Sequence, residues 1–95
     1  MAPDEATTRR VLRIVNRLGL HARAAARLAT LAAEYQADID VHFQGHVANA
    51  KSIMGLMMLA AGQGSELELA AHGPDATDAV TAIEQLVADR FGEDD

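Results

Sequence analysis

Apolar and polar residues alternate in four short stretches of the chain, which is the pattern of strands with one buried face. The clearest is Asp38–Phe43, where Ile39 and Val41 are expected to face inward and the acids between them to face water. Gln44-Gly45 supplies a turn after this stretch, so a hairpin is expected there. The predicted strands are Thr8–Val15, Asp38–Phe43, His46–Asn49 and Glu66–His72.

Three other stretches have apolar residues at helical spacing. The first begins at Ala22 and runs to about Tyr35, and its many alanines favour close packing against a sheet. The second, Ser52–Leu59, is apolar on nearly every side, so some of its residues are expected to face a partner. Ordinary core packing is the alternative for any one of them. The third follows Asp75, which we expect to cap it, and its core stripe is Ala79, Val80, Ile83, Leu86, Val87 and Phe91.

The order of these elements, βαββαβα, predicts an α+β fold in which the helices cover one face of the sheet. We expect an open-faced sandwich, with a four-stranded antiparallel sheet and three helices on one face. The 95 residues make one such domain and leave no room for a second. Residues 1–7 and 92–95 are expected to be flexible tails, the latter because the chain closes on Glu93-Asp94-Asp95.

The composition narrows the class of protein. With 49% apolar residues the chain is globular, and no apolar run approaches the roughly 18 residues that cross a bilayer. The first residues are acidic where a secretory signal has basic ones, which predicts a cytoplasmic location without membrane association. Zero cysteines exclude disulfides and thiolate chemistry, so any reaction must use other groups.

Charge is distributed unevenly along the chain. Up to Arg27, six arginines accompany two acids, for a net charge of +4, whereas from Leu28 onward two basic residues accompany twelve acids, for −10. The overall charge of −6 argues against general nucleic-acid binding. The arginines gather around His21 in the sequence and would attract a phosphate group or an acidic partner. A solvated arginine-rich face is the alternative.

His21 stands between a glycine turn and the first predicted helix, in Arg17-Leu18-Gly19-Leu20-His21-Ala22-Arg23. The first N–H groups of a helix lack intrahelical acceptors and lie at the positive end of its dipole, which suits phosphate. This field favours neutral imidazole, whose free nitrogen is a nucleophile, and the Arg23 guanidinium is able to hold phosphoryl oxygens. These features predict a phosphate-accepting histidine. The alternative is a polar helix-entry residue with no chemistry.

Other side chains argue against competing functions. His42 and His46 flank a turn, but no third ligand has a recognisable spacing, so no metal site is expected. The sequence has no P-loop and no dinucleotide-binding glycine pattern, so we expect no nucleotide cofactor. Phe43 is the only aromatic residue on a predicted strand, which argues against an RNA-binding sheet.

Three motifs occur in an order that is typical of one family. Gly19-Leu20-His21-Ala22-Arg23-Ala24-Ala25 is similar to Gly-(Leu/Ile)-His-(Ala/Thr)-Arg-Pro-Ala, and Lys51-Ser52-Ile53-Met54-Gly55 matches Lys-Ser-Ile-Met-Gly. The third, Gly-Gln-Gly-Ser, stands at Gly62 to Ser65. From about Thr8 to Phe91 the chain thus resembles HPr, the histidine-containing phosphocarrier of the bacterial phosphoenolpyruvate-dependent phosphotransferase system.

The resemblance implies that His21 accepts phosphate from Enzyme I and passes it to a histidine of an EIIA-type domain, while Arg23 stabilises the charge. The protein would then be a monomeric phosphotransfer intermediate without a cofactor, and not an enzyme. The resemblance also implies that an HPr kinase/phosphorylase modifies Ser52 and so slows the transfer. The residues implied in partner binding are Ala24, Arg27, Ile53, Met54 and Met57.

Two departures leave the place within the family open. Ala24 replaces the family's usual proline, which pre-sets the first helical turn, so its loss loosens the helix start or adds one donor. Residues 15–19 and 91–95 are more similar to NPr, the nitrogen-branch paralogue, so both sugar transport and nitrogen regulation stay open. The alternative function is an HPr-shaped regulatory module that acts through Ser52 without histidine phosphotransfer, although His21 argues against it. A small structural or metal-handling domain is a further alternative.

Overall fold

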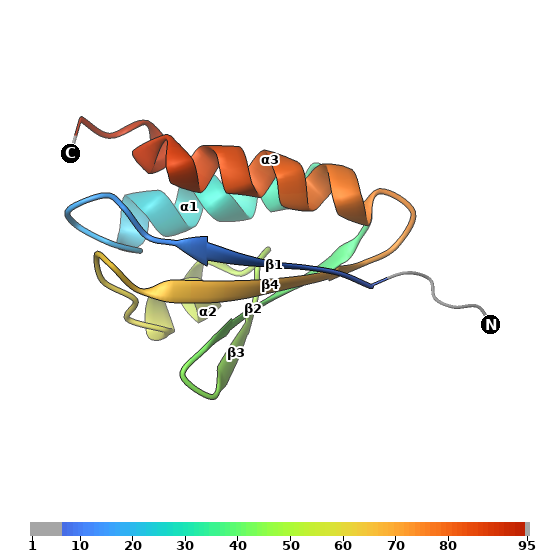
Figure 1. The fold of residues 1–95 in the computed structure, drawn as a ribbon, viewed down its shortest axis with the longest axis horizontal. Helices are drawn as coiled ribbons and strands as arrows, with labels where there is room; N and C mark the ends of the chain where they lie inside the picture. Colours follow the sequence, from blue (N-terminus) through green and yellow to red (C-terminus); the bar gives the residue numbers. More distant parts are fainter. Residues whose placement is uncertain (1–6, 95) are drawn as a thin grey trace.

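The computed structural model describes residues 7–94, and every predicted strand and helix is present in it (Figure 1). The first strand ends at Arg13 instead of Val15, although Ile14 still exchanges backbone hydrogen bonds with the loop before the fourth strand. The first helix ends at Ala32, short of Tyr35. In chain order the elements are β1 (Thr7–Arg13), α1 (Ala22–Ala32), β2 (Asp38–Phe43), β3 (His46–Asn49), α2 (Ile53–Met58), β4 (Glu66–His72), α3 (Ala76–Ala88) and the 3-10 turn η1 (Arg90–Gly92).

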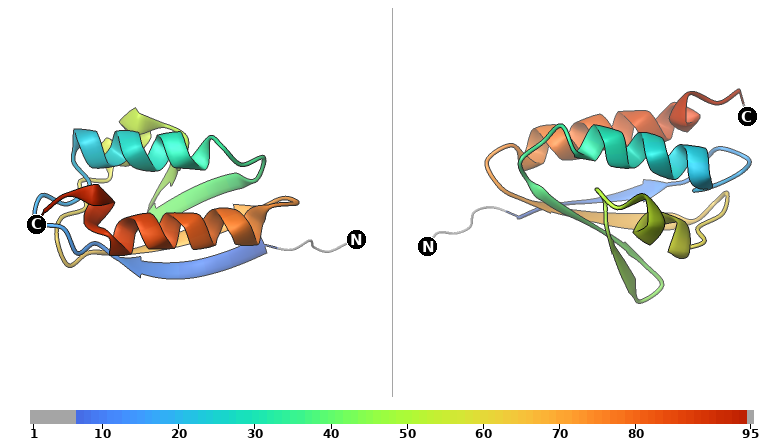
Figure 2. Two further views of the ribbon diagram at one scale, coloured as in Figure 1. Left: turned by 90° about the horizontal axis from the view of Figure 1, so that it is seen from above. Right: turned by 180° about the vertical axis from the view of Figure 1, so that it is seen from behind.

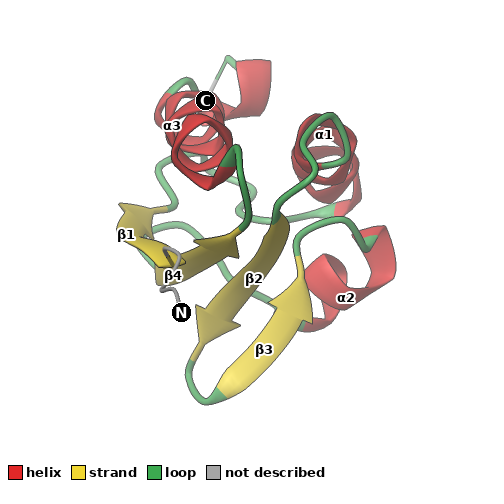
Figure 3. Cartoon of the chain, turned by 90° about the vertical axis from the view of Figure 1, so that its right-hand side faces the viewer, coloured by secondary structure: helices red, strands yellow, loops and turns green. Residues whose placement is uncertain are grey.

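The four strands form one antiparallel sheet in the order β1-β4-β2-β3. The helices lie on one side of this sheet, and α1 runs beside α3 (Figures 2 and 3). None of the described helices covers the opposite face of the sheet (Figures 2 and 3), so the predicted open-faced sandwich is confirmed. Within residues 7–94 no helix has both the length and the apolar character needed to cross a membrane.

The core lies between the sheet and the helices. Helix α1 buries one stripe, which consists of Ala24, Ala25, Leu28, Ala29 and Ala32. Its alanines let the helix approach the sheet closely because they carry so little volume. From the stripe predicted for α3, Leu86 is only partly buried, whereas Ile83 and Val87 are in the core. Helix α2 buries Leu56 and exposes most of its other apolar side chains.

Asp75 precedes α3 as predicted, but its side chain does not cap that helix. Its carboxylate instead accepts hydrogen bonds from the backbone N–H groups of Gln36 and Ala37, both at 2.9 Å. These bonds tie the loop between α1 and β2 to the start of α3. The pKa of Asp75 lies below its ordinary value, mainly because the carboxylate accepts the Gln36 N–H. Burial raises the pKa, but the bonds from Gln36 and Ala37 together outweigh this effect.

The chain after α3 turns sharply back toward α1. Arg90, Phe91 and Gly92 all have left-handed backbone angles, with φ values of 58°, 55° and 78°, and Phe91 is fully buried. Phe91 therefore reaches the core through this turn and not as a continuation of the α3 stripe. The expected flexible tail does not hold for Glu93, because both of its carboxylate oxygens have hydrogen-bond partners. The predicted N-terminal tail does not include Thr7, which belongs to β1 and pairs with His72, and residues 1–6 and Asp95 lie outside the described residues.

Candidate functional site

His21 is the N-cap residue of α1, and the backbone around it is fixed by the loop before β4. Gly19 adopts a left-handed angle, φ +69°, and the Leu20 N–H donates to the Ala61 carbonyl oxygen at 2.9 Å. The His21 carbonyl accepts the first helical bond, from the Ala25 N–H at 2.8 Å. Its imidazole makes no capping hydrogen bond, so the ring is available beside the first N–H groups of the helix.

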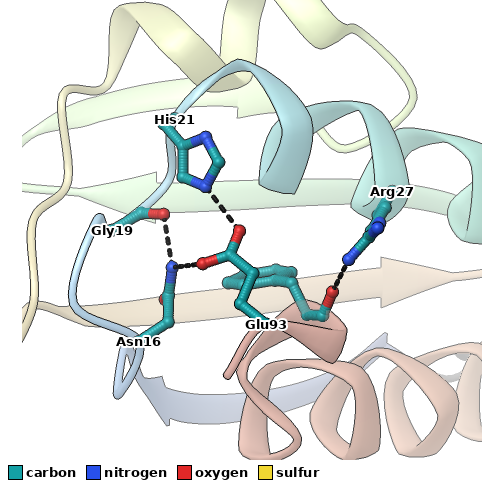
Figure 4. A network of polar contacts seen from close by, with 6 residues as sticks. Asn16, Gly19, His21, Arg27 and Glu93 are labelled. Atoms are coloured by element: carbon teal, nitrogen blue, oxygen red, sulfur yellow. Dashed lines mark hydrogen bonds and ion pairs between the residues drawn. The ribbon is translucent and has the colours of Figure 1, made fainter. Parts of the chain in front are cut away.

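The imidazole of His21 contacts a carboxylate from the far end of the chain. Nε2 of His21 lies 2.5 Å from Oε2 of Glu93, a residue 72 positions away (Figure 4). The other oxygen of Glu93, Oε1, accepts a hydrogen bond of 2.9 Å from Nδ2 of Asn16. The same Nδ2 donates to the Gly19 carbonyl oxygen at 2.8 Å. A continuous polar network therefore links the turn before α1, Asn16, Glu93 and His21.

Asn16 is fully buried, and its orientation in this network follows from its partners. Nδ2 carries two protons and faces two acceptors, so an exchanged amide would put its oxygen against a carbonyl and a carboxylate. Its oxygen Oδ1 has no hydrogen-bond partner among the described residues. Such an orphan acceptor costs about 1–3 kcal/mol. The fold accepts this cost at Asn16, whose side chain holds Glu93.

The pKa of Glu93 is lowered even though the carboxyl group is partly desolvated. Desolvation raises the pKa, but the hydrogen bonds from Asn16 and His21 and the nearby Arg27 charge outweigh it. Glu93 is therefore ionised at neutral pH. Because a carboxylate only accepts hydrogen bonds, the proton in this contact sits on Nε2 of His21. In the neutral ring, Nδ1 is then the nitrogen that carries the lone pair.

Arginine side chains border the same hollow as His21. Its lining contains Arg17 and Arg23 together with Glu93 and Asp94. Arg23 is exposed and belongs to the first turn of α1, as the sequence predicts for a residue that binds phosphoryl oxygens. The site thus combines a free imidazole nitrogen, a helix N-terminus and guanidinium groups, which together are able to receive a phosphoryl group.

Among the residues that the resemblance implies in partner binding, Ala24 is buried, whereas Arg27 is exposed and also holds the chain end. Ala24 is completely buried, so its side chain cannot form part of a docking surface. Arg27 donates from Nη1 to the carbonyl oxygen of Phe91, which anchors the chain that carries Glu93. Sequence reasoning missed Asn16 and Glu93, since an acidic chain end has the pattern of an unstructured tail.

The start of α2 brings Ser52 next to an exposed apolar surface. Oγ of Ser52 accepts the Gly55 N–H at 3.0 Å, which is an ordinary helix cap. Nζ of Lys51 donates to the Tyr35 carbonyl at 2.8 Å. We call the exposed apolar side chains of this helix the α2 surface; they are Ile53 (45% exposed), Met54 (70%), Met57 (40%) and Met58 (77%). Met57 and His21 line one shared hollow, so this surface adjoins the imidazole.

The remaining histidines do not form a second site. In the β2–β3 ladder His42 pairs with Val47 and His46 with Phe43, so the two histidines project from opposite faces of the hairpin. No group of three or more potential metal ligands occurs within residues 7–94.

The fold and the site describe a small α+β protein built around one partly exposed imidazole. Residues 8–89 match the family model described as the PTS HPr component phosphorylation site. Over 80 residues the chain is 50% identical to phosphocarrier protein HPr of Cupriavidus necator, covering 84% of this chain and 90% of the relative. Over 84 residues it is 45% identical to phosphocarrier protein NPr of Shewanella violacea, covering 88% and 92%.

A crystal structure of HPr from Thermoanaerobacter tengcongensis superposes with a TM-score of 0.88 at 38% identity, covering 92% of this chain and 98% of the other. The chain therefore belongs to the HPr family, and it is a phosphocarrier of the phosphotransferase system, of the HPr/NPr type.

Proposed function

We propose that this phosphocarrier accepts a phosphoryl group on Nδ1 of His21 from phosphorylated Enzyme I and passes it to EIIA-type domains. The observation that carries the proposal is the contact of Nε2 with the Glu93 carboxylate, which leaves Nδ1 as the ring nitrogen with a free electron pair. The start of α1 and the guanidinium group of Arg23 supply positive charge beside it.

In the transfer step the Nδ1 electron pair forms a bond to phosphorus while the bond between phosphorus and the donor atom breaks. The electron pair of the broken bond returns to the donor, and the three phosphoryl oxygens keep their negative charge. N–H groups at the start of α1 and the Arg23 guanidinium stabilise that charge. Transfer to the next protein is the same step in reverse, with Nδ1 as the leaving atom.

The α2 surface is the proposed docking region for both partners. Four apolar side chains are exposed there within one short helix, and three of them are methionines, which adapt to partners of different shape. Met57 lines a hollow with His21, so a partner docked on α2 also reaches the imidazole. Since the site is complete within one chain, we also propose that the protein acts as a monomer. Its proposed location is the cytoplasm.

The test is phosphorylation by Enzyme I and phosphoenolpyruvate of the native protein, His21→Ala and the control His46→Ala. We expect the native protein and the control to gain one phosphoryl group that is labile in acid and stable in base, as a phosphohistidine is. His21→Ala should gain none. Acid-labile phosphate on His21→Ala would contradict the assignment.

Arg23 is proposed to act through charge and through the geometry of its donors. Lysine keeps the charge but loses the fork of two donors, so Arg23→Lys should transfer phosphate faster than Arg23→Ala and slower than the native protein. Loss of the whole side chain should cost roughly ten- to hundredfold in rate. Equal rates in all three proteins would remove Arg23 from the mechanism.

A regulatory role of Ser52 is a second proposal, favoured by its position at the edge of the α2 surface. Two negative charges beside Met54 and Met57 would have to be desolvated against an apolar partner, which weakens docking. Ser52→Asp mimics the charge and can still cap α2, so the melting temperature should stay near the native value. The apparent Michaelis constant for Enzyme I should rise about tenfold, which corresponds to roughly 1.4 kcal/mol. Native kinetics for this variant would leave Ser52 as a helix cap alone. If the protein bound its partners through Ser52 but never gained phosphate on His21, the purely regulatory module would be the better description.

A further inference from the structure

Glu93 is the part of the site that phosphoryl transfer by itself does not require. A carboxylate repels an incoming phosphoryl group, yet this one lies against the accepting ring. The two side chains are only 28% (His21) and 13% (Glu93) exposed, so water screens the contact weakly. Both oxygens of Glu93 are engaged, one by His21 and one by Asn16. The charge is therefore held in one place relative to the ring.

Residues 89–94, which we call the C-terminal strap, are built to bring Glu93 to this place. Phe91 anchors the strap in the core with no exposed surface, and Arg27 donates to the Phe91 carbonyl oxygen (Figure 4). Arg90 and Phe91 adopt left-handed angles that non-glycine residues rarely adopt. Strained backbone of this kind persists only where surrounding contacts hold it in place. Here those contacts are the buried Phe91 ring, the Arg27 hydrogen bond and the contact of Glu93 with His21.

The position of Glu93 relative to the two ring nitrogens determines whether its charge hinders or assists phosphoryl transfer. Glu93 faces Nε2, whereas a phosphoryl group would approach Nδ1 on the other side of the imidazole. The carboxylate is thus closer to the ring than to the phosphoryl oxygens, and the attraction to a positively charged ring exceeds the repulsion because Coulomb energy falls with distance. Arg23 lines the same hollow, and its positive charge offsets part of the remaining repulsion.

We propose that Glu93 is a positioning residue for His21, an inference that rests on the proposed phosphocarrier function. Its carboxylate holds the neutral ring in the single tautomer with the proton on Nε2, turns Nδ1 toward the phosphoryl donor, and balances the charge that the ring gains on phosphorylation. During transfer the Nδ1–phosphorus bond forms and the donor bond breaks, while the proton stays on Nε2. The ring then carries a positive charge next to Glu93, and no proton has to leave or enter.

Glu93→Gln is the variant that removes this function at nearly constant size. Its amide has one oxygen and one NH₂ group, so either His21 Nε2–H or Asn16 Nδ2 must face a donor. If the NH₂ group turns to His21, it selects the opposite tautomer, with the proton on Nδ1. Asp94→Asn is the matched control, since Asp94 lines the same hollow and loses the same charge.

The first measurement is the tautomer of the unphosphorylated His21 ring, read from the NMR signals of its two nitrogens. The second is the rate of phosphorylation by Enzyme I, separated into kcat and KM. We expect the native protein and Asp94→Asn to hold the proton on Nε2, and Glu93→Gln to populate the Nδ1–H form. The kcat of Glu93→Gln should fall about tenfold with little change in KM, because the α2 surface is untouched.

An unchanged tautomer and kcat in Glu93→Gln would overturn the inference, as would an equal loss in Asp94→Asn, which would reduce the effect to general charge. The proposed function fails separately, if the native protein gains no phosphate on His21. The tautomer comparison still tests Glu93 in that case because it needs no phosphorylation.

Discussion

The N-cap side chains at the starts of α1 and α2 make contacts of very different range. At α2 the N-cap side chain, Ser52, accepts the N–H of Gly55, three residues away. At α1 the N-cap side chain, His21, makes no cap and instead contacts Glu93, 72 residues away. The first arrangement is complete within one helical turn, whereas the second requires the sheet, α3 and the C-terminal strap to be in place.

The start of α1, unlike that of α2, is free for chemistry. The Ser52 hydroxyl is engaged in holding its own helix together, and any modification there acts on a local cap. The His21 ring does not cap its own helix, and its orientation is set by the contact with Glu93 in the C-terminal strap. A reactive group whose position is set by distant contacts keeps its geometry while its own helix N-terminus stays open to a ligand.

The largest effect is expected from Phe91→Ala, which removes the anchor of the C-terminal strap. Loss of this fully buried ring should lower the free energy of unfolding by about 3–5 kcal/mol. Urea denaturation measures this loss. In the folded variant the His21 tautomer should also become mixed. The control Val87→Ala removes a buried side chain from α3 but leaves the strap, so it should destabilise the protein without changing the tautomer. If Phe91→Ala kept the native tautomer, the C-terminal strap would not determine the tautomer of His21.

Gly19→Ala should give the next effect, on the turn that delivers His21. A Cβ atom there would lie 2.6 Å from the Ala61 carbonyl oxygen, and φ is +69°. Gly45→Ala is the matched control, because it has φ +82° and no neighbouring atom within 4 Å. The left-handed angle should cost both variants about 1–2 kcal/mol. The clash should add about 1–3 kcal/mol to Gly19→Ala only. Equal unfolding free energies would show that the turn relaxes freely.

Ser52→Ala should lower the free energy of unfolding by about 1 kcal/mol, the usual value of an N-cap. Because the cap is local, the rate of His21 phosphorylation should remain near the native value. Ser52→Gly should lose only a few tenths of a kcal/mol of unfolding free energy, because glycine is itself a favourable N-cap residue. A strong loss of phosphoryl transfer in Ser52→Ala would mean that the two helix starts are coupled.

The smallest effect is expected from acid. The pKa of Glu93 is lower in the folded protein, so its contribution to stability is present above the ordinary carboxyl pKa and is lost as the pH falls through the lowered value. The stability difference between native protein and Glu93→Gln should therefore shrink in acid. The difference between native and Ser52→Ala should not change, because that bond involves no titrating group. Asp75 has a lowered pKa as well, but it is present in all three proteins and cancels. Urea unfolding at several pH values makes the comparison.

Sequence patterns predicted the parts of this molecule that short-range rules determine. The limits of β2 and β4 follow directly from the alternation of apolar residues. The location of His21 at a helix start was also evident from the residues around it. Periodicity carries this information because each of these features involves neighbours along the chain.

The features that sequence patterns missed all depend on contacts between distant segments. The Asp75 carboxylate binds the N–H groups of Gln36 and Ala37 and not its own helix. Phe91 fits the apolar spacing of α3, but the left-handed turn at Arg90 takes it out of that helix. Glu93 belongs to an acidic chain end, and nothing local distinguishes it from Asp94. Only the folded strap brings it to His21.

The most direct test of the account is the identity of the phosphorylated atom. Protein with isotope-labelled histidine rings is phosphorylated by Enzyme I and phosphoenolpyruvate, and the coupling between phosphorus and the ring nitrogens is observed by NMR. We expect one phosphoryl group, on Nδ1 of His21, with the proton still on Nε2 next to Glu93. Phosphate on Nε2, on another residue, or on none would contradict it.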